Sequence, residues 1–197
     1  MKDIWVEKYR PKTVDEYVFK DNAQKHQVKS WITDGGIPHL LFSGSAGTGK
    51  TTLAKVLIND LGVQEADVLL INASRDNGVD LIRRKITNFS ETMPWGDYKV
   101  ILLDEADYIS AEGQAALRGV MEQYHMSVRF ILTCNYPNKI IPALHSRCQG
   151  FHITSLDYAR DRMQEPNFVD KKARVWFSKA YFILLELILT FCDKIVC

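Results

Sequence analysis

Residues 44–51, GSAGTGKT, fit the G-x-x-x-x-G-K-[ST] pattern of a phosphate-binding loop. The glycines let the backbone curl so that successive N–H groups face phosphate oxygens, while Lys50 reaches the β and γ phosphates and the Thr51 hydroxyl ligates Mg²⁺. Residues 39–43 are typical of a buried strand and residues 51–61 have helical spacing of apolar side chains, so the flanks have the required order. An ordinary glycine-rich turn is the alternative. The predicted nucleotide-binding residues are Gly44, Ser45, Ala46, Gly47, Thr48, Gly49, Lys50, Thr51 and Thr52.

A second apolar run, residues 100–103, is followed at once by acidic residues and predicts a buried parallel strand that ends in carboxylates. Ligands bind at the carboxyl ends of parallel strands, so these acids should lie beside the phosphate-binding loop. We expect Asp104 to hold Mg²⁺ together with Thr51, and Glu105 to orient or deprotonate an attacking water. Asp107 receives no role, because an acid that caps a helix fits it equally well.

Two further polar residues fit the same chemistry. Asn135 ends the strand-like run 128–134, where its amide can sense a γ-phosphate, although the following Pro137 also fits an ordinary turn. Arg147 is expected in a loop or at a short helix end. An arginine can neutralise charge on a transferring phosphoryl group, in cis or from a neighbouring subunit, and is worth about 10³–10⁵ in rate. A structural ion pair is the alternative.

Length and composition limit the fold class, but they do not identify a binding partner. A chain of 197 residues with 46% hydrophobic content fits one domain or slightly more. The net charge of +1 gives no overall electrostatic signature, so a nucleic-acid contact requires a local basic patch. The four cysteines have no paired C-x-x-C spacing and no secretory signal opens the chain, so we expect a reducing cytoplasm.

The segment 175–191 is very apolar but is interrupted by Lys179 and Glu186. A membrane span needs about 20 apolar residues with few charges, which favours a helix that faces the core or a partner. A membrane helix and a segment that is not a native folding element are the alternatives.

The motifs together resemble one family, the AAA+ sliding-clamp loaders, and are similar to replication factor C small subunits and to the ATPase subunit of T-even-type phage loaders. The resemblance covers about residues 3–154. It implies an α/β P-loop NTPase fold with a three-layer αβα parallel sheet, and an ATP hydrolase whose activity depends on oligomerisation. ATP and Mg²⁺ are the implied cofactors. The segments that carry it are 5–11, 44–51, 72–74, 104–107, 133–135 and 146–148.

The resemblance also implies partners and residue roles. The partners are a sliding clamp, other loader subunits in a ring-like oligomer and primer-template DNA at a cytoplasmic replication fork, with no membrane. Tyr9, Arg10 and Pro11 would pack near the adenine, Asn135 would be the first sensor, and Arg147 would enter the next subunit's ATP site. The implied catalytic residues are therefore Glu105, Asn135 and Arg147.

A coupling element is predicted on the helix that starts near Ala111. Gln114, Arg118 and Glu122 have i, i+4, i+8 spacing and share one face beside the acidic strand end. Matching Gln and Arg positions in phage loaders resemble a relay between DNA and the catalytic carboxylate. A solvated helix face would show the same spacing.

The densest basic cluster is Arg83, Arg84 and Lys85, on a helix expected over residues 79–89. Because loaders turn this region toward the duplex, these side chains, and more weakly Arg75, are candidates for phosphate contacts that do not read bases. A solvated face is again the alternative.

The expected domains are an AAA+ ATPase domain at 1–154 and a divergent, helical tail at 155–197. A loader subunit continues into a helical lid with a second sensor arginine and then a collar, and both are expected to be absent here. A frameshifted, interrupted or split gene, or a fragment completed by another chain, would each explain the tail.

The expected function is a motor that uses ATP to open a clamp and load it on primer-template DNA. The alternative is a truncated nucleotide-binding interaction subunit without independent ATPase activity. A DEAD-type helicase, suggested by the letters DEAD at 104–107, fails because two nucleotide-binding lobes do not fit in this length.

Overall fold

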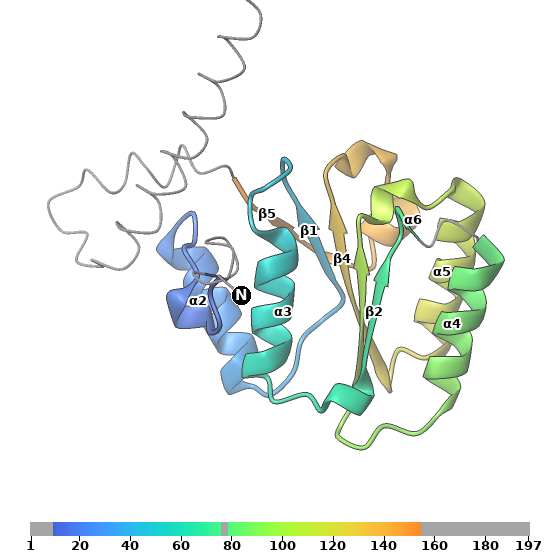
Figure 1. The fold of residues 1–197 in the computed structure, drawn as a ribbon, viewed down its shortest axis with the longest axis horizontal. Coiled ribbons are helices and arrows are strands. Elements are labelled where there is room, and N and C mark those ends of the chain that lie inside the picture. Colours follow the sequence, from blue (N-terminus) through green and yellow to red (C-terminus); the bar gives the residue numbers. More distant parts are fainter. Residues whose placement is uncertain (1–9, 76–78, 155–197) are drawn as a thin grey trace, which may run out of the picture.

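Five strands form an all-parallel sheet in the order β2-β3-β4-β1-β5, with helices on both faces (Figure 1). The computed structural model describes residues 10–75 and 79–154, so the predictions for Tyr9 and for the tail lie outside the described residues. The elements are η1 (Val14–Glu16), α2 (Asn22–Thr33), β1 (Leu40–Ser43), α3 (Lys50–Asp60), η2 (Glu65–Asp67), β2 (Val68–Asn72), α4 (Val79–Glu91), β3 (Lys99–Asp104), η3 (Ala106–Tyr108), α5 (Ala111–Gln123), β4 (Val128–Cys134), η4 (Pro137–Lys139), α6 (Pro142–His145) and β5 (Gln149–His152).

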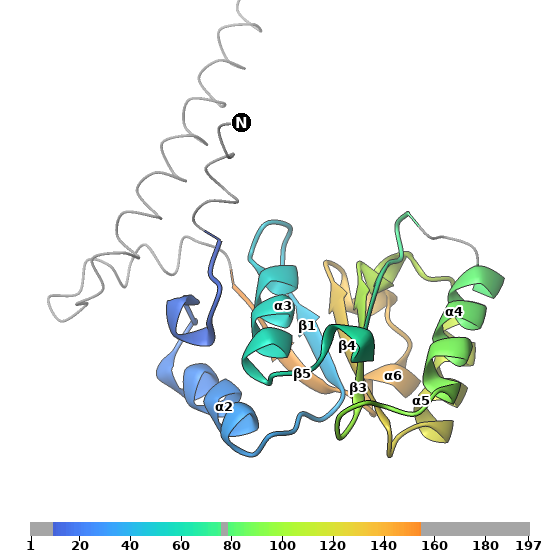
Figure 2. The same cartoon turned by 60° about the horizontal axis from the view of Figure 1, so that its bottom comes forward.

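The central strands bury both of their faces, which explains why they are continuous apolar runs in the sequence. Leu40 and Phe42 of β1 pack into one core, while Leu41 packs into the other. In β3, Leu102 and Leu103 divide between the same two cores. The sheet therefore separates a core under α2 and α3 from a core under α4 and α5, as Figures 1 and 2 show. The predicted three-layer αβα fold is confirmed.

Helices α2, α3 and α5 differ in whether a side chain caps their N-terminus, and the uncapped one of these follows the predicted phosphate-binding loop. The carboxylate of Asp21 caps α2 by accepting from the Gln24 N–H at 2.8 Å, and the hydroxyl of Ser110 caps α5 by accepting from the Gly113 N–H at 3.2 Å. By contrast, α3 follows Gly49 and has no side-chain cap. The N–H groups of its first turn are thus available to a ligand.

Strand register brings the predicted site elements to one edge. Ser43 at the end of β1 pairs with Cys134 at the end of β4, and Asn72 at the end of β2 pairs with Asp104 at the end of β3. The segments that follow these four strands leave the sheet at the same edge. Within residues 10–75 and 79–154, no helix is long and apolar enough to cross a membrane.

Candidate functional site

The glycine-rich loop folds as a strand-loop-helix unit, as predicted. The ammonium group of Lys50 donates to the carbonyl oxygens of Gly44 at 2.8 Å and Ser45 at 2.7 Å, so the lysine lies across its own loop. Gly47 and Gly49 have φ of +78° and +90°, which glycine adopts without steric cost. The loop leads directly into the uncapped start of α3, the arrangement that binds anionic groups at helix N-termini.

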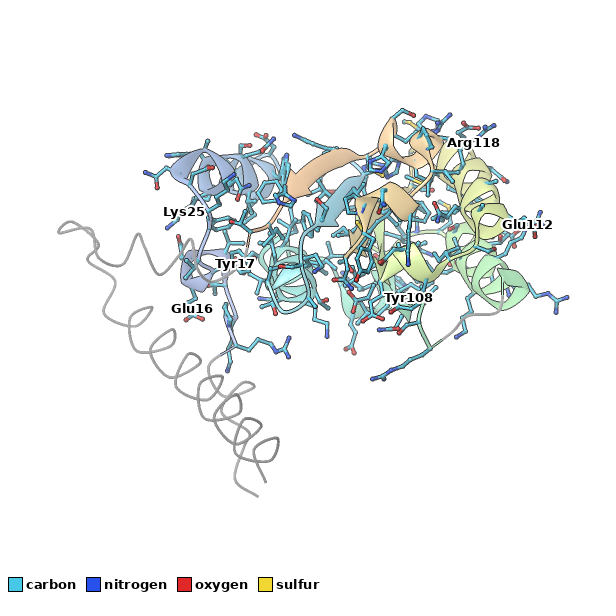
Figure 3. All side chains as sticks on the ribbon, turned by 90° about the horizontal axis from the view of Figure 1, so that it is seen from above. Glu16, Tyr17, Lys25, Tyr108, Glu112 and Arg118 are labelled. Carbon is cyan, nitrogen blue, oxygen red and sulfur yellow. The ribbon has the colours of Figure 1, made fainter. Side chains whose placement is uncertain are left out.

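Close packing around the loop explains why residues 44 and 49 are glycines. A Cβ on Gly44 would lie 2.1 Å from the carbonyl oxygen of Ile153, which follows β5. A Cβ on Gly49 would lie 3.2 Å from the hydroxyl of Tyr17, which directly follows η1. Tyr17 is buried, and burial raises its pKa, so its hydroxyl stays protonated. Figure 3 shows Tyr17 beside α3.

Lys50 is 8% exposed, although its side chain carries a charge. Burial lowers the pKa of Lys50, while the nearby charges of Asp104, Asp107 and Glu105 act in the opposite direction. The cation is thus held among acids at a partly desolvated edge, where its attraction for phosphate oxygens is stronger than in water.

The acidic end of β3 is organised by two hydroxyl groups. Oδ1 of Asp104 accepts from the hydroxyl of Thr51 at 2.6 Å and from the hydroxyl of Thr133 at 2.6 Å. The Thr133 oxygen in turn accepts from the Glu105 N–H at 3.0 Å. Thr51 and Asp104, the two predicted metal ligands, therefore lie in direct contact.

The sequence reasoning gave no role to the Thr133 side chain. The signal in the sequence was a hydroxyl residue near the end of the apolar run 128–134, where burial is expected and a buried hydroxyl requires a partner. In the structure Thr133 is 1% exposed. Thr133 joins β4 to the acidic end of β3.

Glu105 occupies a left-handed backbone conformation, with φ of 58° and ψ of 44°. Among the described residues it is the one non-glycine residue with positive φ. This conformation costs roughly 1–2 kcal/mol for an L-residue, and such strain clusters at functional sites. The half-buried Glu105 directly follows Asp104, so both predicted acids lie at the site edge.

Asn135 follows β4 directly and is half-buried at the same edge. The next residue is held by Asp107, whose Oδ2 accepts from the Tyr136 N–H at 3.3 Å. Asp107 lies within η3 and so does not cap a helix. Its Oδ1 is buried and has no hydrogen-bond partner in the described part of the chain. A buried carboxylate thus lies under the turn that carries Asn135.

The N-terminal segment reaches the site through Arg10. Its guanidinium donates to the Thr52 hydroxyl in the first turn of α3 at 3.2 Å, and Pro11 beside it is half-buried. Thr52, the last residue of the predicted nucleotide-binding set, thus contacts the segment that was expected near the adenine.

Arg147 follows α6 and makes its contacts away from its own phosphate-binding loop. It donates to the carbonyl oxygen of Ala143 at 2.7 Å, and its other terminal nitrogen pairs with Glu122 on α5. Oε1 of Glu122 also lies 3.5 Å from Nε of Arg118. Arg118 and Glu122 thus lie on one face of α5, as predicted, and Glu122 contacts the segment that ends in Arg147. The coupling role of this face stays a prediction.

Gln114 is the buried member of that face. Its amide nitrogen donates to the carbonyl oxygens of Ile109 at 2.9 Å and Lys139 at 3.0 Å, and its oxygen accepts from the Ile141 N–H at 2.8 Å. Gln114 therefore joins α5 to the segment between η4 and α6. In Figure 3, Arg118 lies toward the far side of the molecule from Tyr17.

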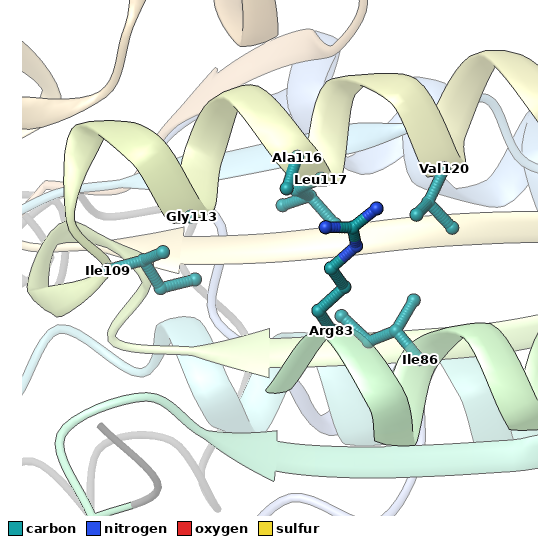
Figure 4. Close-up of a pocket in the computed structure, with 7 residues that line it drawn as sticks. All are labelled: Arg83, Ile86, Ile109, Gly113, Ala116, Leu117 and Val120. Atoms are coloured by element: carbon teal, nitrogen blue, oxygen red, sulfur yellow. The ribbon is translucent and has the colours of Figure 1, made fainter. Parts of the chain in front are cut away.

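The basic cluster on α4 is exposed but is not a single patch. Successive residues of a helix point about 100° apart, so Arg83, Arg84 and Lys85 diverge. Arg83 lines a groove between α4 and α5, and Figure 4 shows its guanidinium beside Ala116 and Leu117. Arg75 is exposed after β2, where its N–H donates to the Asn72 side chain at 3.2 Å.

Comparison with known proteins agrees with this geometry. A family model described as "ATPase family associated with various cellular activities (AAA)" matches residues 40–155. The chain belongs to this family. It is a nucleotide-binding protein, and the predicted resemblance to replication factor C small subunits is confirmed by the relatives below.

The chain is 46% identical over 160 residues to the Replication factor C small subunit of Methanococcus vannielii, covering 79% of this chain and 50% of that protein. It is 49% identical over 155 residues to the protein of the same name from Archaeoglobus fulgidus, covering 77% and 48%. The chain thus spans about half the length of these relatives. A match to the protein of that name from Methanococcus maripaludis (strain C7), 45% identical, covers 91% of this chain and 58% of that protein, so it extends past Thr154.

Solved structures with the same fold include RuvB of Thermotoga maritima, with a TM-score of 0.59 and 17% identity over 79% of this chain and 55% of that chain. A DNA polymerase III gamma subunit-related protein from Thermotoga maritima has a TM-score of 0.56 and 15% identity, covering 71% and 49%. At these identities the likeness concerns the fold.

Proposed function

We propose that this chain is the ATPase module of a sliding-clamp loader, which uses ATP binding and hydrolysis to open a clamp and load it on primer-template DNA. The observation that carries the proposal is the convergence of Thr51 and Thr133 on one oxygen of Asp104, beside the buried Lys50. The relatives named Replication factor C small subunit support the choice of a clamp loader among ATPases.

Nucleotide binding follows from the loop contacts. Lys50 exchanges its two carbonyl partners for β and γ phosphate oxygens, and the uncapped start of α3 faces the same group. Thr51 and Asp104 supply a hydroxyl and a carboxylate oxygen, which fits Mg²⁺, since this ion takes one or two protein oxygens and fills its remaining positions with phosphate and water. The ion would neutralise charge that develops on the phosphates.

Hydrolysis requires residues from two chains in this proposal. Glu105 orients and deprotonates the attacking water, and Asn135 contacts the γ-phosphate from the end of β4. Arg147 acts on the ATP of a neighbouring subunit. Its contacts with α5 and α6, made in place of contacts with its own loop, support action in trans.

The proposal is tested with Lys50→Ala and Glu105→Gln in the full chain. Lys50→Ala should weaken binding of a fluorescent ATP analogue by at least about tenfold, because charge-assisted contacts to phosphate are lost. Glu105→Gln should leave binding intact and reduce ATP turnover, measured with clamp and primed DNA, by about 10²–10⁴. Lys55→Ala, on the exposed side of α3, is the control for charge.

Loss of ATP binding in Glu105→Gln would show that the roles of the two acids are reversed. If the unaltered chain binds ATP but does not turn it over with clamp, primed DNA and loader subunits, the alternative of a nucleotide-binding interaction subunit is correct.

A further inference from the structure

Helix α5 holds the segment that ends in Arg147 at two separate points. At its start, the buried Gln114 bonds to the backbone of Lys139 and Ile141. At its end, Glu122 pairs with Arg147 itself. The first contact fixes the backbone ahead of α6, and the second fixes the side chain after it.

The guanidinium of Arg147 is held by three groups in this arrangement. One terminal nitrogen donates to the Ala143 carbonyl at 2.7 Å and to the Ser146 hydroxyl at 3.3 Å, while the other contacts Oε1 of Glu122. The side chain of Arg147 is nevertheless 32% exposed. It is ordered before any partner arrives and still accessible, so little side-chain entropy remains to be lost on binding.

Oε1 of Glu122 also contacts Arg118, at 3.5 Å from Nε. One carboxylate oxygen thus lies between two guanidinium groups. Ala143 and Ser146 hold only one terminal nitrogen of the Arg147 guanidinium, and Glu122 holds the other. Removal of the Glu122 charge would free that second nitrogen and leave two neighbouring cations without their common anion. The carboxylate therefore sets the orientation of the Arg147 guanidinium.

We propose that Glu122 is the positioning residue for Arg147, holding its guanidinium in the orientation that is presented to the phosphate groups of a nucleotide bound by the neighbouring subunit. This inference rests on the proposed function of Arg147. A role in stability alone would be small, because exposed ion pairs contribute only about 0–1 kcal/mol. The Glu122 side chain is 46% exposed.

The experiment places Arg147 and the phosphate-binding loop that it serves on two different kinds of full-length chain. Acceptor chains carry Arg147→Ala and keep their phosphate-binding loop. Donor chains carry Lys50→Ala and keep their arginine. Mixed with clamp, primed DNA and any other loader subunits, the two should recover ATP turnover, because each shared site then combines an intact loop with an intact Arg147.

The inference is tested by adding Glu122→Gln to the donor chains. This change keeps the size of the side chain and an acceptor oxygen but removes the charge. We expect kcat of the mixture to fall about 10-fold to 100-fold, a part of the roughly 10³–10⁵ that such an arginine contributes, with KM for ATP unchanged. Donors with Glu112→Gln, an exposed acid in the first turn of α5, should behave like the original donors.

The outcomes distinguish the inference from the proposed function. If the mixture without the Glu122 change recovers no turnover, the trans role of Arg147 is wrong and the inference fails with it. If that mixture is active and Glu122→Gln donors equal Glu112→Gln donors, only the positioning role is overturned. Equal thermal unfolding midpoints for the two donors would show that the loss of kcat does not come from unfolding.

Discussion

At the scale of single residues, the site depends on how one carboxylate is held. Asp104 receives hydroxyl donors from two elements, Thr51 at the start of α3 and Thr133 near the end of β4. Thr133 also accepts from the backbone of Glu105, the residue in the left-handed conformation. One threonine thus orients Asp104, the acid proposed to hold Mg²⁺, and steadies the strained turn that carries Glu105, the acid proposed to act in hydrolysis.

Thr133→Val should therefore separate this function from packing, because valine keeps the branched shape and removes the hydroxyl. We expect a loss of stability of about 1–3 kcal/mol, since the partly buried Glu105 N–H is left without its acceptor. ATP turnover should fall more than ATP affinity, because the acids lose their mutual orientation.

Thermal unfolding and steady-state kinetics of Thr133→Val and Thr33→Val check this prediction. The Thr33 hydroxyl donates to the Lys29 carbonyl on an exposed turn of α2, so its loss should change stability by less than about 0.5 kcal/mol. Equal kinetics in the two variants would remove Thr133 from the site.

At the scale of elements, the phosphate-binding loop shows what a pattern can and cannot predict. Its glycines follow from the motif, and their positive φ values agree with it. The approach of Gly44 to the Ile153 carbonyl does not follow, because that contact depends on β5 pairing with β1. Local sequence predicts backbone freedom, while close approach is set by strand order.

The two uses of glycine predict different costs for the same substitution. Gly47→Ala meets no atom within 4 Å, so its cost is the backbone strain of about 1–2 kcal/mol. Gly44→Ala would place a methyl group 2.1 Å from the Ile153 oxygen and must displace backbone, so we expect a loss above about 3 kcal/mol.

Chemical denaturation of the two glycine variants measures this difference directly. Both changes lie in the loop and should weaken ATP binding, so stability without nucleotide is the decisive quantity. Equal unfolding free energies would mean that the β5 contact does not constrain the loop.

At the scale of the whole molecule, most of the fold was predictable because buried parallel strands are short apolar runs that end in polar residues. The strands that contain residues 40–43, 100–103 and 128–134 all follow this rule. What the sequence could not show were contacts between distant segments. Asp107 under Tyr136 and Glu122 on Arg147 each require a fold before they can be seen.

The basic cluster of α4 is the place where the fold changes a prediction made from the sequence. Three adjacent cations were expected to face DNA together, but Arg83 lies along α5, so Arg84 and Lys85 are the better candidates for phosphate contacts. For duplex DNA, each lost contact lowers the slope of log affinity against log salt by about 0.9.

Arg84→Gln combined with Lys85→Gln should therefore flatten the salt dependence of primed-DNA binding by about one to two units in the assembled complex, while Arg83→Gln alone should change it by less than about half a unit. Lys25→Gln combined with Lys29→Gln on α2, across the sheet, removes the same number of charges and is the matched control. Affinity measured from about 50 to 200 mM salt gives the slopes. If the double variant has the slope of the control, α4 does not contact phosphates, and its basic residues form a solvated helix face.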